Sequence, residues 1–173
     1  MRNILLLLLA LTISFSSNAQ LNEGFESGSF PPTGWTTYRG SNNAGVIYDW
    51  SSTSVYVNSG NNSAFVRYEN SGSLNEDWLV TNLIDLSSSV NAELRFYARQ
   101  DFDQDYGSIY TIKISTTSQT SGFTTLKSWT EAKLTANPDI FYEKVESKYI
   151  TSSKGRILLL HLEVQHTFCS TRY

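Results

Sequence analysis

Cysteine is almost absent from this chain of 173 residues, in which Cys169 has no second cysteine to pair with. An internal disulfide is therefore excluded, so the fold must be held together by side-chain packing or by a bound metal ion. Charged residues are also scarce, at 17% of the sequence, and the formal net charge is −3. Nucleic-acid binding would need clustered Lys and Arg, and no such cluster is present, so this class of partner is excluded as well.

The long hydrophobic run of the sequence stands close to its start. Arg2 precedes an apolar run from Ile4 to Leu11, and a short stretch of small residues ends at Ala19. This order is typical of a secretory signal peptide, which we expect to occupy residues 1–19. The run is about half of the roughly 20 residues that cross a bilayer, so a membrane anchor is the weaker interpretation. We therefore predict a secreted or cell-surface protein with no transmembrane segment.

Alternation of apolar and polar residues predicts strands along the rest of the chain. Between residues 92 and 99, Leu94 and Phe96 fall on one face while Arg95 and Tyr97 fall on the other. The same period of two recurs at residues 108–115 and 141–150, and shorter candidate strands occupy residues 45–50, 54–58, 63–69 and 77–86. Turn-rich stretches separate them, and helical spacing is limited to one turn near residue 131. The pattern predicts an all-β fold, an antiparallel jelly-roll β-sandwich.

The stretch "DFDQDYG" places Asp101, Asp103 and Asp105 at alternate positions between two predicted strands. Calcium loops often begin with carboxylates spaced in this way. The helix-loop-helix version of such a loop requires Gly at its sixth position and Glu at its twelfth, where this chain has Tyr106 and Ile112. A solvated turn is therefore the favoured interpretation, and a cation site that uses one or two of these aspartates is the alternative.

An ordered set of short motifs is more specific than the composition. It comprises a Phe-Glu pair, a Pro-x-Gly-Trp turn, an Asp-Trp-Leu strand start, an Ile-Asp-Leu strand end and a later Ser-Thr. In this chain the set is Phe25-Glu26, Pro32-Thr33-Gly34-Trp35, Asp77-Trp78-Leu79, Ile84-Asp85-Leu86 and Ser115-Thr116. This order, over about residues 22 to 154, resembles the cleaved-adhesin (choice-of-anchor J) domains of exported Bacteroidetes proteins. The resemblance implies a jelly-roll domain over residues 20–154.

Some members of that family bind structural calcium, and the resemblance implies Glu26 and Asp77 as carboxylates inside matching motifs. A charge at the edge of a strand is costly to bury unless it is paired or bound to a metal ion, which agrees with this role. The alternative is that Glu26 caps a turn and that Asp77 accepts hydrogen bonds from backbone N–H groups. We expect these two residues to hold a cation before any of the three aspartates at 101–105.

Residues 155–173 differ in character from the rest of the chain. They contain both histidines and the cysteine, and they end where family members continue with further closing strands. We interpret this tail as out of frame, the result of a frameshift near Gly155, and expect the sandwich to be incomplete at its C-terminus. The apolar run at residues 156–164 nevertheless suits a buried strand.

A catalytic constellation is hard to assemble from this sequence. Ser-His-acid or Cys-His chemistry would have to use His161, His166 or Cys169, all in the atypical tail. Glycosidase chemistry needs two carboxylates, which the composition does not exclude. We predict a non-enzymatic, adhesin-like module that binds a host or matrix protein or a glycan. The alternatives are a carbohydrate-binding accessory domain of a secreted protease or glycosidase, and a structural spacer. Tyr97 and Tyr142, on predicted polar faces, are the candidate binding surface.

Overall fold

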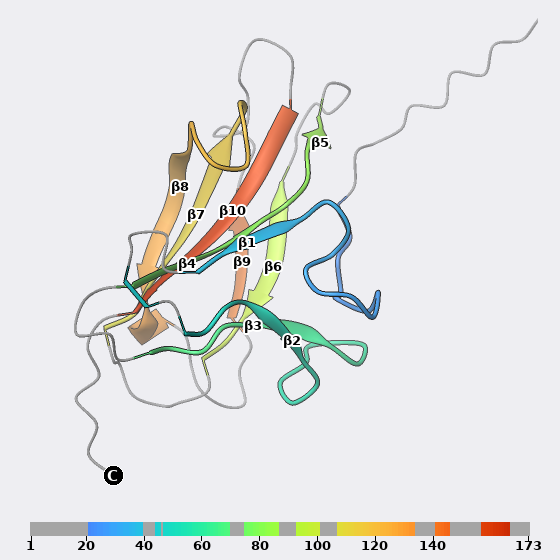
Figure 1. Cartoon of the computed structure of the whole chain (residues 1–173), viewed down its shortest axis with the longest axis vertical. Coiled ribbons are helices and arrows are strands. Elements are labelled where there is room, and N and C mark those ends of the chain that lie inside the picture. The colour runs from blue at the N-terminus through green and yellow to red at the C-terminus, as the bar shows by residue number, and fades with distance from the viewer. Residues whose placement is uncertain are drawn as a thin grey trace, which may run out of the picture.

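Antiparallel strands make up nearly all the regular structure of this protein. The structure is a computed structural model that describes residues 21–39, 44–45, 47–69, 75–86, 93–100 and 107–133, and the backbone of residues 141–145 and 157–166. The helical element within these residues is a single 3-10 turn, η1 (Glu131–Lys133), close to where one turn was expected. The all-β prediction is therefore confirmed (Figure 1).

The larger sheet has six strands. Five of them lie in the order β1-β4-β10-β7-β8, and β5 pairs with the first residues of β10; all the pairings are antiparallel. Their bounds are β1 Thr36–Tyr38, β4 Asn75–Val80, β5 Ile84–Asp85, β7 Ile109–Ser115, β8 Thr124–Thr130 and β10 Ile157–His166.

Strand β10 is the longest strand and lies in the middle of the larger sheet. Its residue His161 is in register with Val80 of β4 on one side and with Lys113 of β7 on the other. The segment whose composition set it apart from the rest of the chain thus supplies a central strand, as its apolar run allowed. The reading-frame change near Gly155 and the domain boundaries stay predictions.

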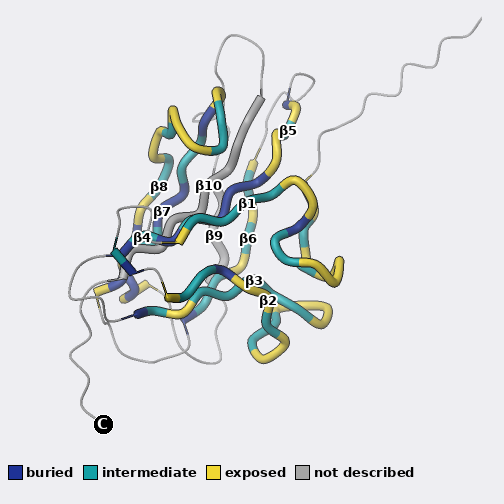
Figure 2. The backbone as a smooth tube through the Cα atoms, in the orientation of Figure 1, coloured by how far each residue is buried: buried dark blue, intermediate teal, exposed yellow. Residues whose placement is uncertain are grey.

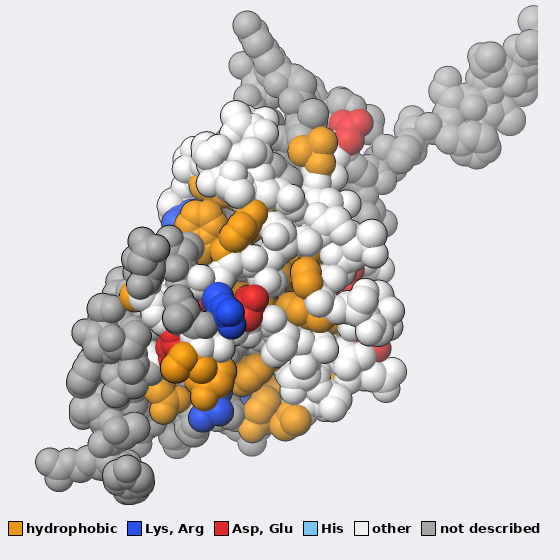
Figure 3. Space-filling model, viewed as in Figure 1, with side chains coloured by type: hydrophobic (Ala, Val, Ile, Leu, Met, Phe, Trp, Pro, Cys, Tyr) orange, Lys and Arg blue, Asp and Glu red, His pale blue; other side chains and the backbone are white. Residues whose placement is uncertain are grey.

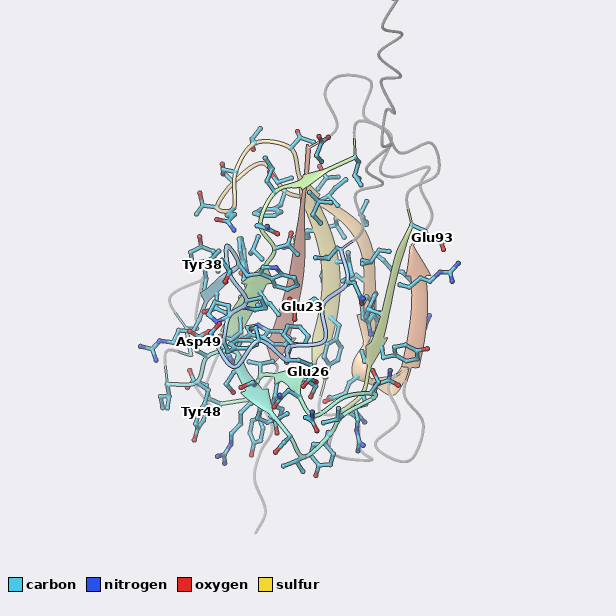
Figure 4. The ribbon with its side chains drawn as sticks, turned by 90° about the vertical axis from the view of Figure 1, so that its right-hand side faces the viewer. Glu23, Glu26, Tyr38, Tyr48, Asp49 and Glu93 are labelled. Atoms are coloured by element: carbon cyan, nitrogen blue, oxygen red, sulfur yellow. The ribbon has the colours of Figure 1, made fainter. Side chains whose placement is uncertain are left out.

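Two smaller pairs of strands lie beside the larger sheet. Strands β2 (Ser51–Thr53) and β3 (Ser63–Phe65) form a hairpin, and β6 (Leu94–Ala98) pairs with β9 (Phe141–Val145). Viewed from the side, β6 and β9 stand apart from the strands of the larger sheet, so the molecule has two layers (Figure 4). This is the arrangement of a sandwich, in which apolar side chains fill the space between two sheets.

The core between the layers consists of two apolar clusters. In one, Ile112 and Trp129 of the larger sheet pack against partly buried residues that include Leu94, Phe96 and Ala98 of β6. In the other, Trp50 and Leu79 pack against partly buried residues of the N-terminal segment, of β3 and of the position that follows β3, namely Phe25, Phe30, Trp35, Ala64 and Val66. Tyr110 contacts both clusters and joins them, and buried backbone follows β4 and β7 (Figure 2).

The predicted faces of β6 agree with this packing. Leu94 and Phe96 point into the core, while Arg95 and Tyr97 are exposed, because successive side chains of a strand point to opposite faces. The prediction of a strand at residues 54–58 is wrong. Strand β2 ends at Thr53, and Val55 is 70% exposed instead of facing a core.

Candidate functional site

Tyr97 projects from the outer face of β6 and is 55% exposed, which is unusual for a large aromatic side chain. In register it stands directly opposite residue 142 of β9. Directly opposite positions of an antiparallel pair belong to the same face, so the two candidate tyrosines occupy neighbouring positions. The side chain of Tyr142 lies outside the described residues.

Charged side chains flank Tyr97 along the same segment. Arg95 forms an ion pair with Glu93, and the guanidinium carbon of Arg99 lies 4.3 Å from the centre of the Tyr56 ring. A guanidinium over an aromatic face is held by the ring quadrupole and restricts the movement of both side chains. The neighbourhood of Tyr97 therefore presents an exposed ring beside an ordered cation and aromatic pair.

A second group of aromatic side chains crosses the larger sheet. Tyr38 of β1 is in register with Trp78 of β4, and their ring centres are 6.2 Å apart in an edge-on arrangement. Trp78 makes a similar contact with Phe123 at 5.6 Å, and the Lys113 ammonium lies 5.4 Å from the Trp78 ring. These rings are partly buried by one another, so their contacts are those of packed neighbours.

Glu26 is exposed, and its carboxylate is surrounded by N–H donors from the loop before β3. The backbone N–H groups of Asn61 and Asn62 donate to Oε1 at 2.8 and 2.9 Å, and their side-chain amides donate to Oε2 at 3.4 and 3.2 Å. These bonds stabilise the charged form and lower the pKa of Glu26 below its ordinary value of 4.5. Gly60, with φ of 76°, lies directly beneath the carboxylate.

Glu26 therefore fastens the N-terminal segment to the β2–β3 hairpin, and Figure 4 places it close to that hairpin. Successive backbone N–H groups that follow a glycine of positive φ form a concave anion-binding turn. Here the bound anion is a side chain of the same protein. This is the turn-stabilising role that the sequence left open as the alternative, and the role of Glu26 as a metal ligand stays a prediction.

Asp77 lies in a different environment. It is 1% exposed on β4, and its Oδ2 accepts a hydrogen bond from Nδ2 of Asn75 at 3.4 Å. Asn75, Asp77 and Leu79 alternate along β4 and share its buried face. Glu26 and Asp77 thus have different hydrogen-bond partners, Asn61 and Asn62 for the first and Asn75 for the second. None of these bonds tests a shared metal ion, so calcium binding by Glu26 and Asp77 together stays a prediction.

The three aspartates of the opening loop, Asp101, Asp103 and Asp105, lie outside the described residues. Among the residues that the structure describes, no three His, Cys, Asp or Glu side chains gather closely enough to hold one metal ion. Calcium also accepts amide and backbone oxygens, which leaves room for a site with fewer carboxylates.

Sequence reasoning missed Glu69, which is 8% exposed and lies near Asn75. A usable signal was present in β4, where the period of two places the polar residues Asn75 and Asp77 on the same face as Leu79. Polar side chains on a core-facing position need partners, but the alternation along β4 does not identify Glu69 as one of them.

The matched motifs at Gly34 and Ser115 meet in space. The Ser115 hydroxyl donates to the Ser121 carbonyl at 2.7 Å and accepts from the Thr117 N–H at 3.1 Å, which closes the loop between β7 and β8. From this loop, Gln119 donates to the carbonyls of Gly34 and Thr81 at 2.9 and 2.8 Å. These motif residues therefore order connections at one end of the sandwich.

Comparison with known proteins identifies a solved structure with a similar fold. No protein-family model matches the sequence, and no curated protein matches it. Among solved structures, the K1 cleaved adhesin domain of Lys-gingipain from Porphyromonas gingivalis W83 is similar, with a TM-score of 0.56 and 19% sequence identity. The match covers 86% of this chain and 97% of that one. At this identity the likeness shows the fold, and it confirms the antiparallel sandwich expected from the sequence. No helix in the described part of the chain is long and apolar enough to cross a membrane.

Proposed function

We propose that this chain is an exported, non-enzymatic binding module of the cleaved-adhesin family. The observation that carries the proposal is the structural likeness to a cleaved adhesin domain over nearly the whole of that domain. The ordered motifs from Phe25-Glu26 to Ser115-Thr116 support it independently, because they were identified from the sequence alone. One fold can carry many functions, so the function must be inferred from the site. In this chain the candidate site is the exposed surface around Tyr97.

The proposed ligand is a glycan, bound at Tyr97. An exposed aromatic ring stacks on the apolar face of a sugar and loses little conformational entropy in doing so, because it has two side-chain torsions. Figure 3 draws the face of the molecule that lies away from β6, and hydrophobic side chains form several separate groups there. Beside Tyr97, Arg95 is paired with Glu93 and Arg99 lies over the Tyr56 ring. A surface whose charges already have partners suits an uncharged, hydroxyl-rich ligand better than a strongly charged one.

A glycan array probed with the full chain tests the proposal, followed by Tyr97→Ala and Tyr97→Phe on the best ligand. Loss of the ring should weaken binding about tenfold, equivalent to about 1.4 kcal/mol, whereas phenylalanine keeps the stacking face and should bind nearly as well. Val55→Ala removes another exposed apolar side chain and is the matched control. Silence across the array, or equal binding by the Ala variant, contradicts glycan binding at Tyr97.

A host or matrix protein is the other partner expected for an adhesin. Binding of the chain to immobilised matrix proteins, with loss on Tyr97→Ala and no array signal, would favour it. The second candidate function is an accessory carbohydrate-binding domain of a secreted protease or glycosidase, which the likeness to a domain of Lys-gingipain favours. Sequencing the gene beyond codon 155 would distinguish the two, because an accessory domain requires a catalytic domain in the same reading frame. If the chain binds neither the glycan array nor the matrix proteins, and the gene encodes no catalytic domain, a role as a structural spacer is the remaining candidate.

We also propose export to the medium or cell surface and a structural calcium ion. Antibody labelling of intact cells and of the culture medium tests export, and protein confined to the cell interior contradicts it. For calcium, Asp77 is buried and has an N–H donor from the Asn75 amide, whereas Glu26 is exposed and its oxygens face several N–H donors. A calcium titration that Glu26→Gln leaves unchanged would remove Glu26 from the ligand set.

A further inference from the structure

A group of buried polar side chains surrounds Gly45 where β4 begins. Asn75 and Asp77 are the first and third residues of β4 and are 0% and 1% exposed. Glu69, which follows β3, is 8% exposed. Two carboxylates and an amide are thus held out of water, which costs free energy unless each oxygen has a partner.

Two of the oxygens in this group have no hydrogen-bond donor. The Ile47 N–H donates to Oε2 of Glu69 at 2.8 Å, and Nδ2 of Asn75 donates to Oδ2 of Asp77 at 3.4 Å. Because a carboxylate is an acceptor, the Asn75 amide must turn its nitrogen toward Asp77 and its Oδ1 away from it. Oε1 of Glu69 and Oδ1 of Asn75 are buried and have no hydrogen-bond partner.

Both of these acceptor groups lie against Gly45. Its φ is 69°, and a Cβ on it would stand 2.5 Å from Oε1 of Glu69 and 2.6 Å from Cγ of Asn75. The carboxylate and the amide therefore share a small volume directly against the glycine backbone. Neither acceptor oxygen can donate to the other, so each needs a partner from outside the pair.

We propose that Glu69 and Asn75, with the neighbouring Asp77, bind a hard divalent cation of the calcium class. A cation against Oε1 of Glu69 and Oδ1 of Asn75 gives both oxygens a partner and offsets the charge of the two buried carboxylates. Calcium takes carboxylate and amide oxygens, whereas zinc sites are built chiefly from His and Cys. The ligand set is new, because the resemblance implied Glu26 as the partner of Asp77.

The cation would join the segment after β3 to the start of β4, against the chain at Gly45. Its expected role is therefore structural, and it does not depend on glycan binding. Extracellular calcium modules have Kd values of roughly 0.1–1 mM. At 10 mM CaCl2 the melting temperature of the full chain, freed of metal with EDTA, should rise by about 3 to 10 °C relative to NaCl of equal ionic strength.

The decisive variant is Glu69→Gln, which keeps the shape of the side chain and its acceptor for the Ile47 N–H. Its new NH2 group can donate to Oδ1 of Asn75, so the variant should fold. Without calcium it should melt at or above the wild-type temperature, because the unpartnered carboxylate oxygen is gone. With 10 mM CaCl2 the order should reverse, because only the wild type gains from the ion.

Glu93→Gln is the matched control, since it also removes one carboxylate but from an exposed ion pair with Arg95. It should keep the full calcium response, both in melting temperature and in calorimetric titration with CaCl2. The proposal is overturned if the wild type shows neither heat nor a melting shift with CaCl2. It is also overturned if Glu69→Gln responds to CaCl2 as strongly as the wild type.

Discussion

Glu26 and Glu69 each pack against a glycine in the left-handed region of the backbone, Gly60 and Gly45 respectively. Glu26 is exposed, and four N–H groups converge on its two oxygens. Glu69 is buried, receives one N–H on Oε2, and has no hydrogen-bond partner for Oε1. The exposed carboxylate is therefore satisfied by its own chain, while the buried one is left needing a positive partner.

These two sites show how a carboxylate that stabilises the fold is distinguished from one that is available to bind a ligand. The number of acidic residues at a site says little, because both sites are built around a glutamate beside a glycine. What distinguishes them is the balance of donors and acceptors, which only the folded chain reveals. Mutations that shift this balance at one site and not at the other test the comparison.

The glycines give the largest expected effect. Gly45→Ala would force a Cβ against the buried Asn75 and Glu69, in addition to the penalty for a positive φ. We expect a loss of roughly 2 to 5 kcal/mol in the free energy of unfolding, measured by urea denaturation. Gly28→Ala is the matched control, because its φ is 75° and its Cβ would meet nothing within 4 Å. It should cost only about 1 to 2 kcal/mol.

Gly60→Ala should fall between these two variants. Its Cβ would meet the Glu26 carboxylate, which is the far end of an exposed and flexible side chain and can move away. If Gly60→Ala proves as costly as Gly45→Ala, the contrast between a rigid buried site and a yielding exposed one is wrong.

The exposed site predicts a pH dependence. Because the pKa of Glu26 is lowered in the folded state, its contribution to stability is fully present above its ordinary value of 4.5 and is lost as the pH falls through the folded pKa. Wild type should therefore be more stable than Glu26→Gln at pH 7, and the two should converge in strong acid. Urea denaturation of both proteins from pH 7 to pH 2 checks this, with Glu93→Gln as the control. A difference that persists unchanged at pH 2 would contradict the assignment.

The smallest effect on stability is expected at Tyr97. Its ring is more than half exposed, and so Tyr97→Ala should change the free energy of unfolding by less than about 0.5 kcal/mol. The same variant is expected to weaken glycan binding, which separates a binding residue from a packing residue. A destabilisation comparable to that of a core residue would mean that Tyr97 is packed against the fold.

Much of the sandwich could be predicted from the sequence, because alternation reports directly on which face of a strand is buried. Leu94 and Phe96 face the core and Tyr97 faces outward for this reason. Val55 shows the limit of that signal, since it lies in an alternating stretch that was predicted to be a strand and is nevertheless 70% exposed.

The two carboxylate sites required the tertiary structure. Glu26 meets Asn61 and Asn62 across 35 and 36 residues of sequence, and the chain at Gly45 meets Glu69 and Asn75 only after β3 and β4 are in place. The motifs pointed to Asp77 as a metal ligand, which stays a prediction, but they gave no indication that Glu69 and Asn75 are buried near it.

The most direct test of the cation site is a crystal structure of the full chain grown with CaCl2, with the ion located by its anomalous scattering. We expect an ion about 2.3–2.6 Å from Oε1 of Glu69 and from Oδ1 of Asn75. A water molecule or a protein N–H donor at that position, with no ion, would contradict the account.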